Sequence, residues 1–142
     1  GYTLVDVRVI VYDGKHHSVD SKDIAFATAG RKAFIEAVKA ARPIVLEPVA
    51  KVEISAPEQA MGDIAGDLSS RRGQVNGTQN SAVGTVTIRG QAPLAELAGY
   101  QSRLNAMTAG QGRYALALSH YDPVPPTVQT QLMSQFKVKD ED

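Results

Sequence analysis

Apolar and polar residues alternate at the start of the chain, as they do in a β-strand with one apolar face. The alternating residues are Val5, Val7, Val9 and Val11 on one side, with Asp6, Arg8, Ile10 and Tyr12 between them. Asp13-Gly14 is a typical turn sequence, and Lys15, His16 and His17 follow it directly. The pattern therefore predicts a strand from Leu4 that ends in a tip carrying Lys15, His16 and His17.

A helical pattern follows this strand. Asp20 is a suitable N-cap residue, and Asp23 would lie in the first turn. The apolar stripe of this helix consists of Ile24, Ala27, Phe34, Ala37, Val38 and Ala41. Gly30 interrupts the pattern, which predicts the close approach of another backbone, and Pro43 ends the helix.

A second unit begins after the apolar run Ile44–Leu46 and the break at Glu47-Pro48. Its predicted elements are a strand at 51–55, a helix from Pro57 capped at Gly73, strands at 74–79 and 85–89, a helix from Pro93, and a strand at 113–120. The two helices carry apolar stripes, one of Met61, Ile64, Ala65 and Leu68, and one of Leu94, Leu97, Ala98, Leu104 and Met107. The order β-α-β-β-α-β predicts an α+β, ferredoxin-like fold.

These boundaries predict three parts, at 1–48, 49–122 and 123–142. The proline-rich run Asp122–Pro126 is expected to leave the second domain. A short helix is predicted at 127–136, and the acidic end at 140–142 is expected to fray.

Composition narrows the classes of function. The 142 residues include 15 basic and 15 acidic side chains, so contact with nucleic acid would have to come from local clusters and not from the net charge. The chain has no cysteine, which excludes disulfides and thiolate metal sites. Its apolar runs are far shorter than a membrane span, so we expect a cytoplasmic protein without membrane contact.

The candidates for catalysis are weak. Adjacent side chains such as those of His16 and His17 point apart, so they are poor ligands for one metal ion. His120 and Asp122 lie near each other in sequence, but a catalytic triad needs convergence in space, and a polar strand end is the simpler interpretation. Gly110-Gln111-Gly112 precedes a strand, not a helix, and no GxxxxGK[ST] sequence occurs. We therefore expect no catalytic, cofactor-binding or metal site, and no enzymatic activity, in this chain.

Contact with RNA has more support. Imidazole rings stack on bases and donate to phosphates, so Lys15, His16 and His17 form a candidate RNA-binding tip, although a solvated turn is the alternative. Arg71 and Arg72 form a second candidate, although positive charge at a helix C-terminus also offsets the helix dipole.

Several stretches resemble elongation factor G. They are Tyr2–Val9 with Tyr12–Gly14 and Val19–Ser21, Leu46–Glu53, Met61–Leu68, Arg71–Gln74, Gly99-Tyr100, Gly112-Arg113 and His120-Tyr121. The first group is similar to the second half of the family's fourth domain. Leu46–Glu53 resembles the junction into its fifth domain, and the others are similar to the fifth domain. The resemblance covers the chain from Tyr2 to about Pro125.

The resemblance implies a partial unit like domain 2 of ribosomal protein S5, followed by a ferredoxin-like domain. It places His17 at the tip that reaches the ribosomal decoding centre, and Arg71 and Arg72 near RNA of the GTPase-associated centre. It also implies that GTP binds to a domain outside this chain, in a factor that moves tRNA and mRNA through the ribosome. The stretch Asn105–Arg113 is longer and less basic than in the standard factor, which favours a paralogue and leaves ribosome recycling open.

Two alternatives remain. The chain is either part of such a factor or a stand-alone ferredoxin-like interaction or regulatory module. An incomplete sheet in the first unit also makes a dimer of this chain a further alternative.

Overall fold

The computed structural model describes residues 2–19 and 21–135, and the chain divides into two units. One unit is Val45–Pro125, and the other combines Gly1–Ile44 with Pro126–Asp142. No helix in the described part of the chain is both long enough and apolar enough to cross a membrane.

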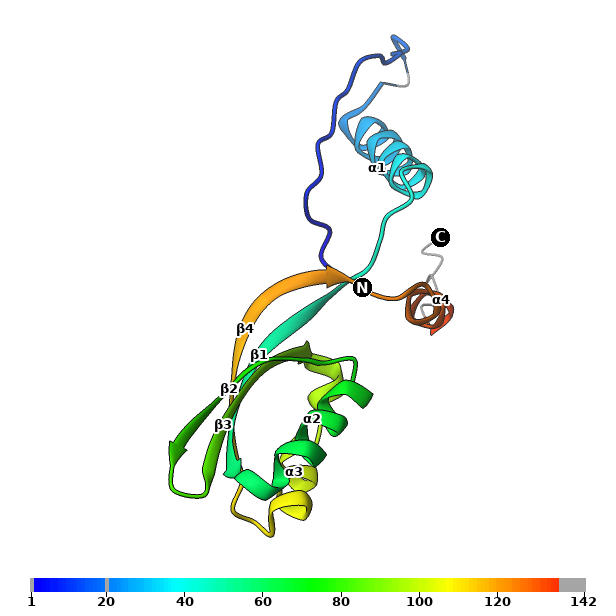
Figure 1. Ribbon diagram of the computed structural model, residues 1–142. Helices are drawn as coiled ribbons and strands as arrows, with labels where there is room; N and C mark the ends of the chain where they lie inside the picture. The colour runs from blue at the N-terminus through cyan, green and yellow to red at the C-terminus, as the bar shows by residue number, and fades with distance from the viewer. Residues whose placement is uncertain (1, 20, 136–142) are drawn as a thin grey trace. The chain divides into compact units, whose positions relative to one another are not determined.

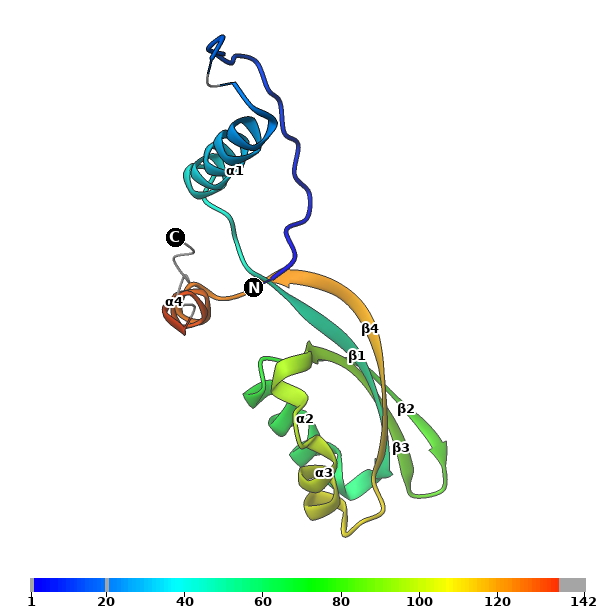
Figure 2. The same cartoon turned by 180° about the vertical axis from the view of Figure 1, so that it is seen from behind.

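The Val45–Pro125 unit is a four-stranded antiparallel sheet with two α-helices on one face (Figure 1, Figure 2). Its elements are β1 (Leu46–Pro57), a 3-10 turn η1 (Glu58–Ala60), α2 (Met61–Ser70), β2 (Gln74–Ala82), β3 (Thr85–Pro93), a 3-10 turn η2 (Leu94–Leu97), α3 (Tyr100–Thr108) and β4 (Arg113–Pro123). The strand order is β2-β3-β1-β4. The predicted β-α-β-β-α-β order and the α+β class are confirmed.

The core lies between this sheet and the two helices. In the central strand β1, Val52 and Ile54 are buried while Lys51, Glu53 and Ser55 are exposed, which is the alternation of a strand covered on one face. The largest side chains that α2 and α3 bury fully against this face are Tyr100, Ile64, Leu68 and Leu104, and Ile88 of β3 is fully buried beside them. Ile64 and Leu68 of one predicted stripe, and Leu97 and Leu104 of the other, are buried in this core. Met61, Leu94 and Ala98 of the same predicted stripes are exposed.

Prolines mark different boundaries from those predicted. Pro48 does not interrupt the chain but lies inside β1, paired only with Tyr121 of β4, where its missing N–H breaks no ladder on the other side. Pro57 and Pro93 end strands and precede 3-10 turns, so α2 and α3 begin later, at Met61 and Tyr100.

The run Asp122–Pro126 also differs from its prediction, because β4 continues through its first residues. Leu46 pairs with Pro123, and the Val124 N–H donates a hydrogen bond to the Val45 carbonyl at 2.9 Å. Val124 is buried. The chain therefore leaves the sheet only after these contacts.

The C-terminal end of α2 is closed by Arg72 and not by the predicted Gly73. Arg72 has φ 58°, in the left-handed region that usually favours glycine. The Gly73 N–H reaches the Leu68 carbonyl at 2.8 Å, and the Arg72 N–H reaches the Ser69 carbonyl at 3.2 Å, which together form a Schellman motif. Gly73 is needed for space, since a Cβ there would lie 2.8 Å from the Leu68 carbonyl oxygen.

The other unit contains α1 (Asp23–Ala40) and α4 (Pro126–Gln135). The prediction of a strand from Leu4 is wrong for this structure, because residues 2–19 form no strand. A strand needs a partner for its backbone N–H and C=O groups, and no described segment pairs with these residues. The mixed α/β character of the chain thus comes from the sheet of the Val45–Pro125 unit.

Helix α1 confirms the predicted helix but not its details. Lys22 occupies the N-cap position without a side-chain cap, Asp23 lies in the first turn as predicted, and Asp20 lies outside the described residues. No described atom lies within 4 Å of the place that a Cβ at Gly30 would take, so the expected close backbone approach is absent there. The apolar stripe is uncovered, as α1 buries none of its described side chains. Phe136 and the acidic end also lie outside the described residues.

Candidate nucleic-acid interface

The predicted tip is an exposed loop. Lys15, His16 and His17 are all exposed, and the residues on either side form no hairpin among those described. The Asp13 carboxylate accepts a hydrogen bond from the Gly14 N–H at 2.7 Å, which fixes the turn before them. The loop thus places three polar side chains together at the surface.

His17 is tied to the segment that enters α1. Its N–H donates to Ser21 Oγ at 2.6 Å, and the Ser21 N–H donates back to the His17 carbonyl at 3.1 Å. The Val19 N–H approaches His17 Nδ1 at 3.4 Å, so Nδ1 acts as an acceptor. The backbone of His17 is therefore held while its side chain stays at the surface.

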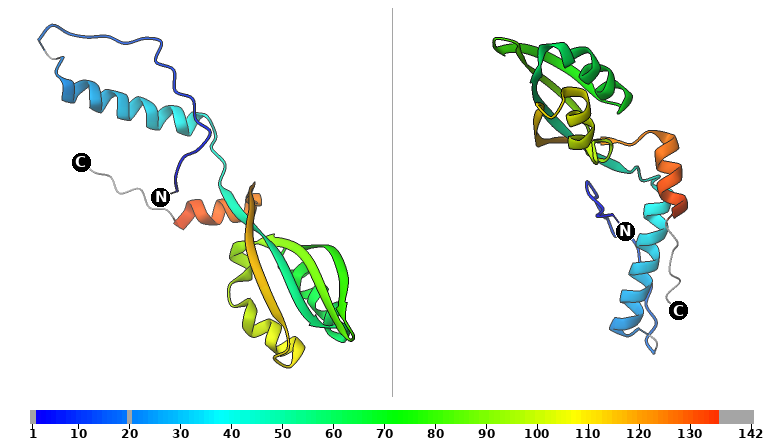
Figure 3. Two further views of the ribbon diagram at one scale, coloured as in Figure 1. Left: turned by 90° about the vertical axis from the view of Figure 1, so that its left-hand side faces the viewer. Right: turned by 90° about the horizontal axis from the view of Figure 1, so that it is seen from below.

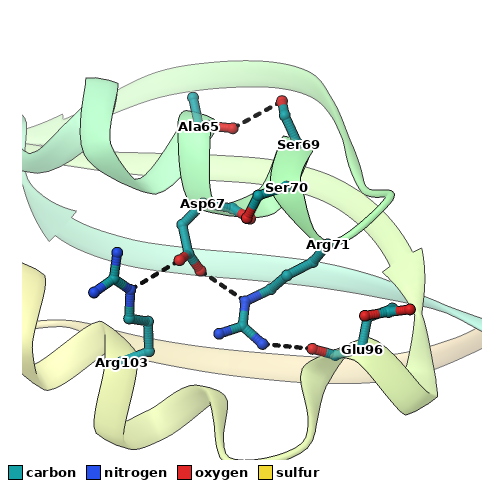
Figure 4. A network of polar contacts seen from close by, with 7 residues as sticks. All are labelled: Ala65, Asp67, Ser69, Ser70, Arg71, Glu96 and Arg103. Atoms are coloured by element: carbon teal, nitrogen blue, oxygen red, sulfur yellow. Dashed lines mark hydrogen bonds and ion pairs between the residues drawn. The ribbon is translucent and has the colours of Figure 1, made fainter.

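Arg71 belongs to a network of ion pairs and hydrogen bonds that joins the end of α2 to η2 and α3 (Figure 4). Its Nε donates to Asp67 Oδ2 at 2.8 Å, and its Nη1 donates to the Glu96 carbonyl at 2.5 Å. The Arg103 Nε donates to the other Asp67 oxygen at 2.8 Å. One carboxylate thus joins two arginines from different helices.

Burial and charge set the ionisation of this network. Burial alone would raise the pKa of the Asp67 carboxyl, but hydrogen bonds from Arg103 and Arg71, together with their charges, hold it below its ordinary value. The Arg71 guanidinium also lies 5.3 Å from the centroid of the Tyr100 ring. Burial, with the nearby charge of Asp67, raises the pKa of Tyr100 to about 12. At neutral pH the Asp67 carboxylate is therefore charged and the Tyr100 hydroxyl is neutral.

Arg72 is bound to two carboxylates. Its Nη1 and Nη2 donate to the two oxygens of Glu47 at 2.6 and 2.9 Å, and its Nε donates to Glu96 at 3.1 Å. Hydrogen bonds to Glu47 raise the pKa of Arg72 above its ordinary value, although burial opposes this. The bidentate pair joins the end of α2 to the start of β1.

These partners bear on the prediction that Arg71 and Arg72 contact RNA. A phosphate would have to compete with carboxylates that already bind both guanidinium groups. RNA contact by these arginines stays a prediction, while their role within the fold is visible. The Asp67–Arg71 spacing of four residues signals such a pair in the sequence, whereas nothing in the sequence indicates Glu47, Glu96 or Arg103 as partners.

The structure does bring His120 and Asp122 together. His120 Nε2 lies 2.9 Å from Asp122 Oδ2, and Nδ1 lies 2.9 Å from Ser119 Oγ. The His120 and Asp122 side chains remain 42% and 56% exposed, so the pair is a polar feature of the strand surface. Among residues 2–19 and 21–135, no group of three potential metal ligands converges.

Two family profiles match consecutive parts of the chain. The profile described as "Elongation factor G, domain IV" matches residues 1–42, and "Elongation factor G C-terminus" matches residues 44–132. The chain belongs to the elongation factor G family. The first match contains the Lys15–His17 loop, and the second contains the Arg71 and Arg72 network.

Individual members of the elongation factor G family agree with this assignment. The chain is 45% identical over 135 residues to "Elongation factor G" of Aquifex pyrophilus, which covers 95% of this chain and 19% of the relative. It is 41% identical over 135 residues to "Elongation factor G-like protein" of Thermotoga maritima, which covers 95% of this chain and 20% of the relative. The chain thus spans about a fifth of the length of these relatives.

A solved structure is also similar. The crystal structure of the protein ttk003000868 from Thermus thermophilus matches with a TM-score of 0.72 and 35% identity, over 87% of this chain and 19% of that one. The two family profiles and the named relatives confirm the resemblance to elongation factor G seen in the sequence.

Proposed function

We propose that this chain is the ribosome-contacting C-terminal region of a translational GTPase that moves tRNA and mRNA through the ribosome. The observation that carries the proposal is the match of both family profiles along residues 1–132, with the Lys15–His17 loop exposed inside the domain IV match. GTP would bind to a part of the factor outside this chain, because the sequence holds no P-loop.

The loop acts by position in this proposal. Lys15 supplies positive charge, and the imidazoles of His16 and His17 can stack on a base or donate to a phosphate. The two hydrogen bonds between His17 and Ser21 hold the loop against the segment leading into α1, so the side chains are presented without large rearrangement. The decoding region of the ribosome is the proposed target.

The Thermotoga relative is named an elongation factor G-like protein, and for this reason the proposal includes a specialised ribosomal role. Ribosome recycling is the second candidate, and the Asn105–Arg113 stretch is the part of the sequence that favours it.

A chimera tests the proposal. This chain would replace the matching fifth of the Aquifex pyrophilus elongation factor G, and His17→Ala would be compared with the unaltered chimera in a reconstituted translation system. We expect slower translocation with nearly unchanged ribosome-stimulated GTP hydrolysis, because His17 supplies no group to the hydrolysis site. Folding stability should change by no more than about 0.5 kcal/mol, since the side chain is exposed.

Ser18→Ala is the matched control, because Ser18 is an exposed neighbour in the same loop. It should leave both rates unchanged. Equal translocation rates for His17→Ala and Ser18→Ala would refute the proposed role of the tip. An unaltered chimera that splits ribosomes but does not translocate would favour recycling instead.

A further inference from the structure

The sheet of the Val45–Pro125 unit has one face that no helix of that unit covers. Both α2 and α3 lie on the other face, where Val52, Ile54 and Ile88 are buried (Figure 3). The open face is built from alternate residues of the four strands. Between Lys51 and Ser55 its side chains are charged, hydroxylic, amidic or small.

Positive charge gathers on this open face. Lys51, Arg89 and Arg113 are all exposed there. Glu53 is the single acid among residues 51–55 and their partners on β3 and β4, which leaves a net charge of two positive units. Lys51 and Arg113 make no ion pair with any residue that the structure describes.

The other acids of the unit lie outside this part of the face. They are Glu58, Asp63, Asp67 and Glu96 on the helices and 3-10 turns, and Glu47 and Asp122 at the far end of β1 and β4. Glu47 and Asp122 thus border the cationic part of the sheet at one end and Glu58 follows β1 at the other, while Glu53 is the acid within it.

The register fixes where the cations stand. Arg113 lies opposite Ser55, and Arg89 lies opposite Glu53, while Lys51 is two residues further along β1. At about 3.4 Å per residue, the three cations extend over roughly 14 Å of the sheet. The Arg89–Glu53 pair at 2.9 Å is 58% and 57% exposed, and such pairs are worth at most about 1 kcal/mol, so Arg89 can exchange Glu53 for another anion.

The remaining side chains narrow the chemistry of the partner. On β4, Ala115 and Ala117 have short side chains that project little from the face. On β3 and β2, Thr87 and Gln79 offer hydrogen-bonding groups. No aromatic side chain stands on this part of the face, all of which the structure describes, so bases have no ring to stack on. A cationic, hydrogen-bonding surface without stacking rings fits the phosphates and 2′-hydroxyls of a double-stranded RNA.

We infer that the open sheet face, through Lys51, Arg89 and Arg113, binds the backbone of an RNA duplex without reading its sequence. The choice of RNA over an acidic polypeptide rests on the proposed ribosomal function, whereas the position and charge of the surface come from the fold. This surface is distinct from the Lys15–His17 loop and from Arg71 and Arg72.

Binding of the full chain to a mixed-sequence RNA duplex of about 16 base pairs, followed by fluorescence anisotropy at several salt concentrations, tests the inference. Lys51→Ala/Arg113→Ala should weaken binding about tenfold or more at low salt. The slope of log K against the logarithm of the salt concentration should become shallower by about two, one for each lost phosphate contact. Lys51→Arg/Arg113→Lys keeps both charges and should bind within about twofold of the wild type.

A gain of charge supplies the matched control. Gln79→Lys adds a cation to the open face and should tighten binding about threefold, with a salt dependence steeper by about one. Gln101→Lys adds the same charge to the exposed surface of α3, on the opposite side of the sheet, and should change the affinity for the duplex little.

Three results would overturn the inference. They are unchanged binding by Lys51→Ala/Arg113→Ala, equal gains from Gln79→Lys and Gln101→Lys, and tighter binding of polyglutamate than of the duplex. If whole ribosomes bound the chain and Lys51→Ala/Arg113→Ala bound them equally well, the surface would be wrong while the proposed function stood. The translocation assay of His17→Ala is independent of all these readings.

Discussion

Asp67→Asn is the substitution that most directly tests the ion-pair network of the ferredoxin-like unit. The Asp67 side chain is 7% exposed, and each of its oxygens accepts one arginine Nε at 2.8 Å. Asparagine has nearly the same shape but no charge, and it offers one oxygen in place of two. The variant therefore removes one charge-assisted hydrogen bond and weakens the other, without leaving a cavity.

The expected loss of unfolding free energy is about 2 kcal/mol at pH 7, since a hydrogen bond to a charged group contributes about 1.5–3 kcal/mol. Breaking a fully buried ion pair costs about 3–5 kcal/mol. The lower value applies here because the Arg71 and Arg103 side chains are 22% and 56% exposed, so both can regain water when the carboxylate is removed.

The loss of unfolding free energy caused by Asp67→Asn should be smaller in acid than at pH 7. The pKa of Asp67 is lowered in the fold from its unfolded value of 3.8, so the folded state favours the charged form. Its contribution is fully present above about pH 4 and is lost as the pH falls through the folded pKa. The difference between wild type and Asp67→Asn should therefore shrink towards zero in acid.

Urea unfolding followed by the NMR signals of Ile54 and Ile88, at pH 7 and in acid, measures this difference within the ferredoxin-like unit alone. Asp63→Asn is the control, because Asp63 lies one turn earlier in α2 and is exposed, so it should cost about 0.5 kcal/mol or less. Equal losses for Asp63→Asn and Asp67→Asn, or a loss from Asp67→Asn that persists unchanged in acid, would refute the reasoning.

Two further predictions concern the core and the sheet. The Tyr100 hydroxyl is buried with no hydrogen-bond partner among the described residues, so Tyr100→Phe should leave stability at pH 7 unchanged or slightly higher. Because the pKa of Tyr100 is raised to about 12, wild type should lose stability above pH 10 that Tyr100→Phe keeps, and parallel pH curves would contradict this. Gly90→Ala should destabilise the sheet by several kcal/mol, on the order of other backbone clashes, because its Cβ would lie 2.5 Å from the Gln74 carbonyl oxygen. Gly77→Ala, with no described atom within 4 Å, should be neutral or stabilising by roughly 0.5 kcal/mol, and equal thermal shifts for the two glycine variants would count against this account.

The sequence determined the elements of the ferredoxin-like unit and their order. Alternation in β1 and the i, i+3, i+4 spacing in α2 predicted which faces are buried, because both periods follow from the backbone geometry of a single element. Ile54, Ile64 and Leu68 are buried as the pattern requires. The resemblance to elongation factor G likewise rested on short local stretches. Periodicity and short family motifs can both be read from a few consecutive residues, without the rest of the fold.

Helix and strand ends were predicted less well. Pro48 predicts a break, yet β4 and β1 pair on both sides of it. Leu118 alternates as a buried residue would, yet it is 61% exposed, because it stands on an edge strand beyond the reach of the helices. Whether an apolar face is covered depends on neighbouring elements, which one strand does not specify.

Only the tertiary structure decided what the arginines do. Arg72 meets Glu47 and Glu96 across 25 and 24 residues, and Arg103 meets Asp67 across 36. The exposed valines after Leu4 show the same dependence on a second segment. Their alternation is typical of a strand, but no strand forms because no described segment pairs with their backbone. Local periodicity fixes the direction in which a side chain points, whereas an ion pair or a sheet also requires that the fold bring a second segment to meet it.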